Sequence, residues 1–150
     1  MPYCYDWPRP GVAGDVCALS RAPDGEWHVL LITRANPPFQ GAYALPGGFL
    51  DVNEEDLPTC ARRELQEETG LRAPADMPLV GIYSDPKRDP RGQIISAVYL
   101  ALYDWPPPKP EAADDAATAQ WVPASQAQPL AFDHAQVLAD ALALARRIAT

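Results

Sequence analysis

The sequence predicts an α+β fold with strands running in both directions. Two pairs of apolar, β-branched segments are each joined by a polar turn, and two separate segments have the residue spacing of helices. The 18 prolines punctuate these segments rather than fill them. With 150 residues, 47% of them hydrophobic and 21% charged, the chain can bury one core without disulfides. We therefore expect a single domain over residues 1–150.

Four strands are expected as two hairpins. Gly11–Ser20 and Trp27–Arg34 are rich in β-branched and apolar residues, and Pro-Asp-Gly at residues 23–25 is a turn signal between them. Leu79–Ser84 and Ile94–Tyr103 repeat the pattern on either side of a polar loop. The sequence thus predicts two hairpins, separated by the segment that carries the first helix.

Helices are expected at two places. Leu57–Thr69 has helical character and is followed by Gly70, where a left-handed cap is common. The second helix runs from about Asp133 to Ile148, and its first residue can serve as an N-cap. Between the strands and this helix, Trp105–Asp115 is too rich in proline and charge for regular structure, and Trp121 is expected on a further core strand.

Charge and cysteine content limit the partners and the compartment. The formal net charge of −8 works against general binding to nucleic acid or to anionic membranes. Cys4, Cys17 and Cys60 lack the paired spacing of a zinc site and fit free thiols in a reducing cytosol. The N-terminus lacks a basic start followed by an apolar run, and no segment approaches the ~18 apolar residues of a membrane span. We expect a cytoplasmic protein with neither nucleic-acid nor membrane partners.

Carboxylates are concentrated between residues 51 and 68. This segment contains seven acidic residues and two arginines: Asp51, Glu54, Glu55, Asp56, Glu64, Glu67, Glu68, Arg62 and Arg63. On a helix, Glu64, Glu67 and Glu68 are close enough to converge on one point, where oxygen ligands suit Mg²⁺ or Mn²⁺. A lone acidic cluster is more often a solvated face, so the neighbouring residues decide. Upstream, Gly47 and Gly48 let the backbone turn tightly or approach a metal, and a glycine carbonyl could complete the site.

Three parts of this region together resemble the signature of the Nudix hydrolase family. The family pattern is a glycine, five residues, a glutamate, seven residues, and then Arg-Glu-aliphatic-x-Glu-Glu-x-Gly-aliphatic. Arg63–Leu71 matches the last nine positions without exception, and Gly48 matches the first. The segment from Gly48 to Arg63 is one residue longer than the pattern. Counting back from Arg63 selects Glu55 as the first signature glutamate, whereas counting forward from Gly48 selects Glu54.

The resemblance implies a fold, a chemistry and a metal site. The fold is an α/β/α sandwich with a mixed sheet between helices, and the chemistry is metal-dependent hydrolysis of a nucleoside diphosphate linked to another moiety. Mg²⁺ is the implied cofactor, with Mn²⁺ as a substitute, bound by Glu64, Glu67, Glu68 and the carbonyl of Gly47. Arg63 pairs with a signature glutamate and holds the loop on the helix. The general base stays open among five residues: Glu64, Glu67, Glu111, Asp114 and Asp115.

Segments outside the signature are similar to the ADP-ribose pyrophosphatase branch of the family. They cover residues 34–49, 83–92 and 130–134 and supply the expected substrate contacts: Arg34, Phe39, Lys87, Arg88 and Arg91. Lysine and arginine suit phosphate or ribose, and an aromatic ring can stack on a base. A plain hairpin loop and plain packing are the alternatives for these residues. His134, at a helix start, is interpreted as a capping or core-edge residue. The branch implies hydrolysis of ADP-ribose to AMP and a sugar phosphate.

The sequence leaves open a Nudix hydrolase with another substrate, a non-catalytic sensor, and assembly as a homodimer. The signature also serves relatives that act on dinucleoside polyphosphates, nucleoside di- or triphosphates, or NADH. A non-catalytic sensor of nucleotide sugars is the alternative from another class, and the three signature glutamates argue for an enzyme instead. The resemblance also allows a homodimer, with the N-terminal arm around Tyr5 and Trp7 as part of the contact.

Overall fold

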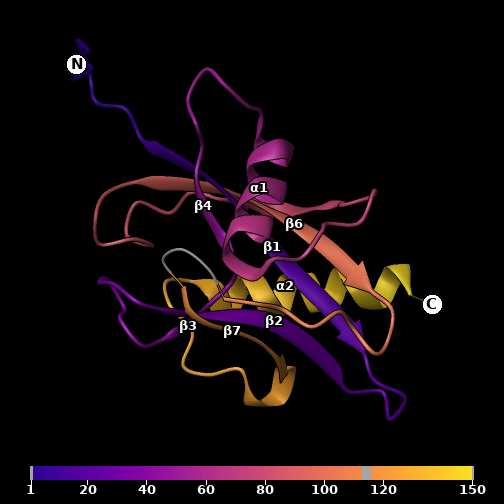
Figure 1. The fold of residues 1–150 in the computed structure, drawn as a ribbon. Coiled ribbons are helices and arrows are strands. Elements are labelled where there is room, and N and C mark those ends of the chain that lie inside the picture. The colour runs from indigo at the N-terminus through magenta and orange to yellow at the C-terminus, as the bar shows by residue number, and fades with distance from the viewer. Residues whose placement is uncertain (1, 113–115, 150) are drawn as a thin grey trace.

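A mixed seven-stranded sheet lies between two helices in the computed structural model, which describes residues 2–112 and 116–149 (Figure 1). The strands are β1 (Gly11–Arg21), β2 (Trp27–Arg34), β3 (Tyr43–Ala44), β4 (Gly47–Phe49), β5 (Leu79–Tyr83), β6 (Ile94–Tyr103) and β7 (Ala116–Pro123). The helices are α1 (Leu57–Thr69) and α2 (His134–Ile148), and a 3₁₀ turn, η1 (Ala124–Gln126), follows β7. The implied α/β/α sandwich is confirmed.

The order of the strands along the sheet is β3-β2-β1-β6-β5. Strands β1 and β6 run parallel, from Gly11 opposite Ile94 to Ser20 opposite Tyr103, whereas the other described strand pairs are antiparallel. On its other edge β1 pairs first with β4 and then, over its last residues, with β2. Strand β7 pairs with the far edge of β2. Strand β1 therefore holds both halves of the sheet and the short strand β4 together.

The two faces of β1 explain why one helix lies on each side of the sheet. Side chains alternate between the faces of a strand. Val16 and Ala18 are buried in one cluster with Leu65 of α1, whereas Cys17 is buried in the other cluster with Val137 of α2. Figure 1 shows α1 in front of the sheet and α2 behind it. Both faces of the sheet are thus covered, which a strand that is apolar on both faces requires.

The two hairpins and the first helix have the bounds expected from the sequence, to within one residue. Gly25, in the first turn, has a φ of +92°, and Gly70 ends α1 with a φ of +72°. Strands β3 and β4 are additional, because strands of two and three residues leave no periodic pattern in a sequence. Residues 104–112 have no regular structure, as expected for the first part of Trp105–Asp115, and residues 113–115 lie outside the described residues. No helix in the described part of the chain is long and apolar enough to cross a membrane.

The start of α2 differs in detail from the expectation. Asp133 occupies the N-cap position, but its side chain caps no backbone N–H. Both carboxylate oxygens instead accept hydrogen bonds from the guanidinium of Arg88, at 2.9 and 2.7 Å. A bidentate hydrogen bond between charged groups is stronger than a single capping hydrogen bond, so the Asp133 carboxylate pairs with Arg88 instead of capping the helix.

Candidate active site

A cavity of about 810 Å³ opens where β1, β4 and α1 meet the start of α2. This volume lies within the range of small-molecule sites. Its lining includes five carboxylates and a second group of arginines and aromatic rings: Asp15, Glu64, Glu67, Glu68, Asp89, Arg34, Arg88, Arg91, Phe49 and Phe132. The cavity thus combines a strongly acidic part with a cationic and aromatic part.

The segment from Tyr43 to Phe49 lies between the two helices and contacts both. The Leu45 N–H donates to Nδ1 of His134 in α2 at 3.1 Å, and the Gly47 N–H donates to Oε1 of Glu68 in α1 at 3.0 Å. A Cβ atom at Gly47 would collide with the carboxylate of Asp15. The absence of side chains at the two glycines is therefore what allows the carboxylates to reach this strand.

Gly48 gives a testable consequence of that close approach. A Cβ atom at this position would lie 2.5 Å from Cδ of Glu64. We expect Gly48→Ala to displace the Glu64 carboxylate and to weaken Mg²⁺ binding about 10- to 100-fold in a calorimetric titration. Gly81→Ala is the matched control, because its Cβ would meet only the Tyr83 side chain at an ordinary 3.4 Å. Equal Mg²⁺ affinities for the two variants would contradict this account.

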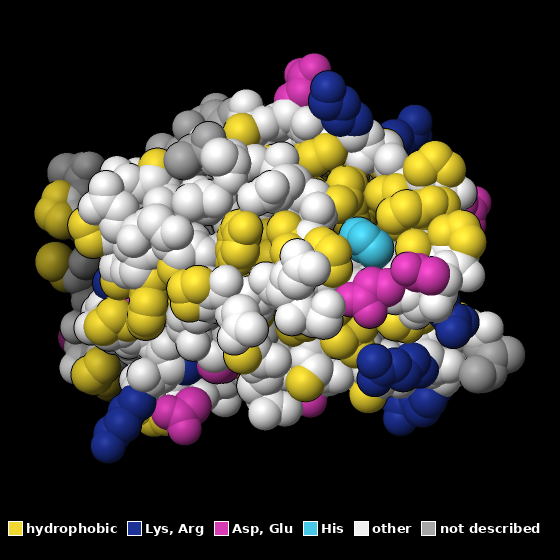
Figure 2. All heavy atoms as spheres, turned by 90° about the horizontal axis from the view of Figure 1, so that it is seen from below, with side chains coloured by type: hydrophobic (Ala, Val, Ile, Leu, Met, Phe, Trp, Pro, Cys, Tyr) yellow, Lys and Arg dark blue, Asp and Glu magenta, His cyan; other side chains and the backbone are white. Residues whose placement is uncertain are grey.

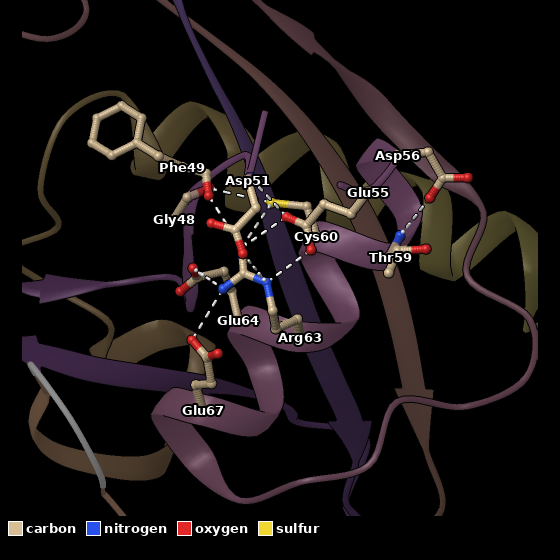
Figure 3. A network of polar contacts seen from close by, with 10 residues as sticks. All are labelled: Gly48, Phe49, Asp51, Glu55, Asp56, Thr59, Cys60, Arg63, Glu64 and Glu67. Atoms are coloured by element: carbon tan, nitrogen blue, oxygen red, sulfur yellow. Dashed lines mark hydrogen bonds and ion pairs between the residues drawn. The ribbon is translucent and has the colours of Figure 1, made fainter. Parts of the chain in front are cut away.

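Arg63 is the centre of the polar network that joins α1 to the loop before it (Figure 3). Its guanidinium donates to both oxygens of Glu55, each at 2.8 Å, and one nitrogen donates to Glu64 at 2.8 Å and to Glu67 at 3.1 Å. It also donates to the carbonyl of Phe49 at 3.2 Å. These bonds hold the pKa of Glu55 at about 2. Arg63 thus ties the loop, the glycine strand and the helix together.

The sequence left Glu54 and Glu55 open for the position of the first signature glutamate, and of these two Glu55 contacts Arg63. Glu54 is exposed, and its backbone N–H donates to the carbonyl of Asp51. The extra residue of this chain is therefore accommodated in the loop before Glu55, and counting back from Arg63 selects the glutamate that the structure places against it.

The three glutamates of α1 line the same cavity, and the carboxyl groups of Glu64 and Glu68 are close enough to share a hydrogen bond. Glu64 and Glu67 are turned toward Arg63, and Glu68 is turned toward the N–H of Gly47. In the described residues, no group of three acidic, histidine or cysteine side chains has the arrangement of a metal cluster. The donor set nonetheless fits Mg²⁺, because it consists of carboxylate and carbonyl oxygens. In this arrangement Arg63 supplies the positive charge that balances Glu64 and Glu67.

Two buried carboxylates face this site without an ion pair of their own. Burial raises the pKa of Glu68 to about 8, and the negative charges of Glu64 and Asp15 add to the effect. Burial likewise raises the pKa of Asp15 to about 7, although Arg88 and Ser96 act in the opposite direction. Asp15 was not predicted as a site residue. The available signal was a single aspartate inside the apolar run Gly11–Ser20.

These raised pKa values predict how the stability of the metal-free protein depends on pH. Both carboxylates bind protons more tightly in the folded chain than in the unfolded chain, from ordinary values of 4.5 and 3.8. The folded state therefore loses stability as pH rises from about 5 to about 8. We expect the Tm measured in a chelator to fall over this window, and to fall less in Glu68→Gln or with Mg²⁺ present. A Tm that rises from about pH 5 to about pH 8 in all three samples would contradict the assignment.

The substrate contacts expected outside the signature occupy different positions. Arg34 and Arg91 line the cavity, with their guanidinium carbons 5.0 and 5.6 Å from the ring centre of Phe132. Arg88 also lines it, but its side chain is 4% exposed and bound to Asp133. Lys87 and Phe39 are not among the described lining residues. Their roles as substrate contacts stay predictions.

Phe132 lies in the segment 130–134 that resembles the family branch and lines the cavity, although it was not among the expected substrate contacts. Phe39 packs against it edge to face, with ring centres 5.0 Å apart, so Phe39 supports the cavity wall from outside. Both residues have positive φ angles, 59° for Phe39 and 54° for Phe132. Such angles are uncommon for bulky side chains and indicate that the surrounding structure holds both rings in place.

A comparison with protein-family profiles identifies the fold and the signature together. The profile described as the NUDIX domain matches residues 12–141. The chain belongs to the NUDIX domain family. This family membership confirms the resemblance that the signature Arg63–Leu71 carries.

Similar proteins relate this Nudix chain to ADP-ribose. It is 43% identical over 112 residues to the ADP-ribose pyrophosphatase of Methanocaldococcus jannaschii, covering 75% of this chain and 64% of that protein. It is 36% identical over 141 residues to the ADPR responsive transcriptional repressor NtrR of Acinetobacter baylyi, covering 92% of this chain and 55% of that protein. The Nudix chain thus spans somewhat more than half the length of each of these two relatives.

A solved structure with the same fold contains a nucleotide sugar. The NUDIX domain of Shewanella oneidensis NrtR, crystallised with ADP ribose, superposes with a TM-score of 0.83 at 29% identity. The match covers 97% of this chain and 94% of that chain. The whole Nudix domain, rather than the signature alone, is therefore shared with an ADP-ribose-binding protein.

Proposed function

We propose that this Nudix protein hydrolyses the diphosphate bond of ADP-ribose in a Mg²⁺-dependent reaction that gives AMP and a sugar phosphate. The observation that carries the proposal is the cavity in which signature glutamates lie beside arginines and aromatic rings. The acidic part suits a cation and the diphosphate attached to it, and the other part suits a nucleoside. The similarity to an ADP-ribose pyrophosphatase supports this choice of substrate.

Glu64, Glu67, Glu68 and the carbonyl of Gly47 would hold Mg²⁺, or Mn²⁺ in its place. When bound, the metal supplies charge stabilisation to phosphate oxygens and lowers the pKa of a coordinated water. The buried carboxylate of Glu68 is suited to this role, because its nearest charged neighbours are the carboxylates of Glu64 and Asp15. A cation there would relieve the repulsion among these groups.

The remaining residues of the site would orient the substrate and move a proton. Burial and the neighbouring guanidinium of Arg91 both lower the pKa of Arg34, and both guanidinium groups lie close to the ring of Phe132, so this part of the cavity is suited to a nucleobase. Of the candidate bases, Glu64 and Glu67 line the cavity, whereas Glu111 is exposed with its N–H bound to the carbonyl of Thr69. The other two, Asp114 and Asp115, lie outside the described residues.

A sensor of ADP-ribose is the second candidate function. It is favoured by the similarity to an ADPR responsive transcriptional repressor and to an NrtR domain that binds ADP ribose. A sensor and an enzyme share the nucleotide pocket and differ in turnover. Only a hydrolysis assay separates the two.

The experiment is a Mg²⁺-dependent hydrolysis panel with products resolved by chromatography. The substrates are ADP-ribose, diadenosine polyphosphates, NADH, and nucleoside di- and triphosphates. AMP released faster from ADP-ribose than from the other compounds supports the proposed function. Faster cleavage of another compound keeps the hydrolase and changes its substrate, and binding of ADP-ribose without cleavage of any compound supports the sensor.

The surface and the thiols support the expected partners and compartment. Figure 2 shows one face on which charged side chains lie mainly toward the margins, with arginine and lysine interspersed among carboxylates. Such a surface, at a net charge of −8, does not favour a phosphate backbone. Cys4, Cys17 and Cys60 are free thiols, which fits the cytoplasm. The exposed aromatic residues of the N-terminal arm, Tyr3, Tyr5 and Trp7, are the proposed contact of a homodimer.

A further inference from the structure

His134, the first residue of α2, has one of its two ring nitrogens fixed by the backbone. Nδ1 accepts a hydrogen bond from the N–H of Leu45 at 3.1 Å. A neutral imidazole that accepts at one nitrogen carries its proton on the other. The hydrogen-bond network therefore assigns the proton to Nε2, and this tautomer presents a donor there.

Nε2 of His134 reaches the cavity. His134 is 5% exposed and lines the cavity, and Nε2 has no protein partner in the described part of the chain. Among the described residues, Oγ of Ser20 is the single side-chain polar atom that is fully buried and has no hydrogen-bond partner. Nε2 of His134 also has no partner among them, so it is not fully buried. Nε2 is therefore accessible from the cavity.

The imidazole stays neutral over the physiological range of pH. Burial lowers the pKa of His134 to about 4. The charges that face it are the carboxylate of Asp133, which acts in the opposite direction, and the guanidinium groups of Arg88 and Arg34, which act in the same direction as burial. The Nε2–H donor is thus a permanent feature of the cavity rather than one that appears and disappears with pH.

The surroundings of His134 indicate which part of a nucleotide it would meet. The ring centre of His134 lies 5.5 Å from that of Phe132. The guanidinium groups of Arg34 and Arg91 lie close to the same Phe132 ring. Aromatic rings and guanidinium groups both stack on nucleobases. The N–H of Leu45 donates to His134, and the N–H of Gly47 donates to Glu68. Because these two residues are two positions apart in the chain, their amides lie at most ~7 Å apart. His134 is therefore next to the acidic part of the cavity but on its aromatic side.

We propose that His134 is a specificity-determining residue whose Nε2–H donates a hydrogen bond to a ring nitrogen of the nucleobase that lies against Phe132. The inference rests on the proposed function, because it takes the substrate to be a nucleoside diphosphate derivative. The acidic part of the cavity is occupied by the diphosphate, so the base is left for the aromatic part. A site that donates to a base nitrogen rejects a ligand that lacks this acceptor, since the buried donor would then be unpaired.

Two variants separate the donor at Nε2 from the acceptor at Nδ1. The amide of asparagine reaches about as far as Nδ1, so His134→Asn keeps an acceptor for the Leu45 N–H and removes the donor in the cavity. The amide of glutamine reaches about as far as Nε2, so His134→Gln keeps a donor in the cavity and removes the acceptor. The probes are AMP, which carries the base, and ribose 5-phosphate, which does not, each titrated in Mg²⁺.

We expect His134→Asn to weaken AMP binding about 10-fold, to leave ribose 5-phosphate binding unchanged, and to keep the wild-type Tm. His134→Gln should bind AMP within about 3-fold of wild type and have a lower Tm. The ratio of the AMP affinities of wild type and His134→Asn should stay constant from about pH 5.5 to about pH 8.5, because the donor does not titrate in that range.

Several results would overturn the inference. These are an AMP affinity unchanged by His134→Asn, an equal loss for ribose 5-phosphate, an equal loss in both variants, or a wild type that does not bind AMP. Because the readout is AMP binding, it is independent of turnover. A wild type that binds AMP but does not cleave ADP-ribose contradicts the proposed function, and the two variants then still decide the role of His134.

Discussion

We expect Glu68→Gln to lower kcat for the proposed hydrolysis of ADP-ribose about 10³-fold while the protein stays folded. The carboxylate is buried, accepts the N–H of Gly47 and lies beside the carboxylates of Glu64 and Asp15. Glutamine keeps the size and the acceptor but lacks the negative charge that would hold Mg²⁺. A metal contributes several kcal/mol of charge stabilisation in the transition state, and each 1.36 kcal/mol changes the rate tenfold. Initial rates at saturating substrate, measured over a range of Mg²⁺ concentrations, check this prediction.

The control for Glu68→Gln is Asp104→Asn, which removes one carboxylate from an exposed loop residue outside the cavity lining. We expect it to leave the rate within about 2-fold of wild type, as for a surface substitution away from the site. In metal-free buffer near neutral pH Glu68→Gln should not lower Tm, because the pKa of Glu68 is raised to about 8 and glutamine replaces a mostly protonated carboxyl with a neutral side chain of the same size. A variant that is inactive because it is unfolded, or one that retains wild-type turnover, would remove Glu68 from the proposed metal site.

We expect Arg63→Met to lower kcat/KM about 10- to 100-fold and to make the protein less stable. The guanidinium forms ion pairs with four carboxylates, so its removal leaves all four without their counter-charge: Asp51, Glu55, Glu64 and Glu67. Loss of a partner that orients metal-binding groups has an effect of this size. Arg63→Lys should not restore activity, because an ammonium group cannot bridge Glu55 on two sides while it contacts α1. Steady-state kinetics and thermal unfolding of the three proteins check both parts.

The neighbouring arginine provides the matched control for Arg63. Arg62 donates to the carbonyls of Pro74 and Ala75 and to none of the signature carboxylates. Arg62→Met should therefore lower Tm without a comparable loss of kcat/KM. Since Arg63 and Glu55 act as a unit, the double variant Arg63→Met, Glu55→Gln should be more active than the sum of the single effects predicts. Full additivity would show that the pair does not act through its contact.

The sequence predicted the parts of the fold that have a local signal. The helix Leu57–Thr69 ends at Gly70 as predicted, and the structure shows that Asp56 caps its start, a local signal that the prediction did not use. The two hairpins likewise follow from apolar segments around turns. The parallel pairing of β1 with β6 has no such signal, because the two strands are distant in the sequence, and β3 and β4 are too short to leave a periodic pattern.

The candidate site shows the same division. The spacing of Arg63–Leu71 predicted a common helix face, but not that Arg63 would donate to two of its glutamates while the third accepts the N–H of Gly47. Phe132 and His134 line the cavity because the start of α2 contacts Leu45 in the connection between β3 and β4, a contact between residues far apart in the chain. Composition and spacing cannot report such a contact, and for this reason His134 was interpreted as a structural residue.

The parallel pairing of β1 with β6 has a consequence for the order in which the chain is assembled during synthesis. A nascent chain that ends before Ile94 already contains the β1–β2 hairpin and every signature residue. It lacks β6, the strand that pairs in parallel with β1 along most of its length. Pairings between distant segments form slowly, because the intervening chain must close a long loop first. The α1 helix therefore lacks a complete surface to pack on until β6 has been made. We expect truncated chains that end before β6 to be unable to bind Mg²⁺ tightly, although they contain all of its proposed ligands.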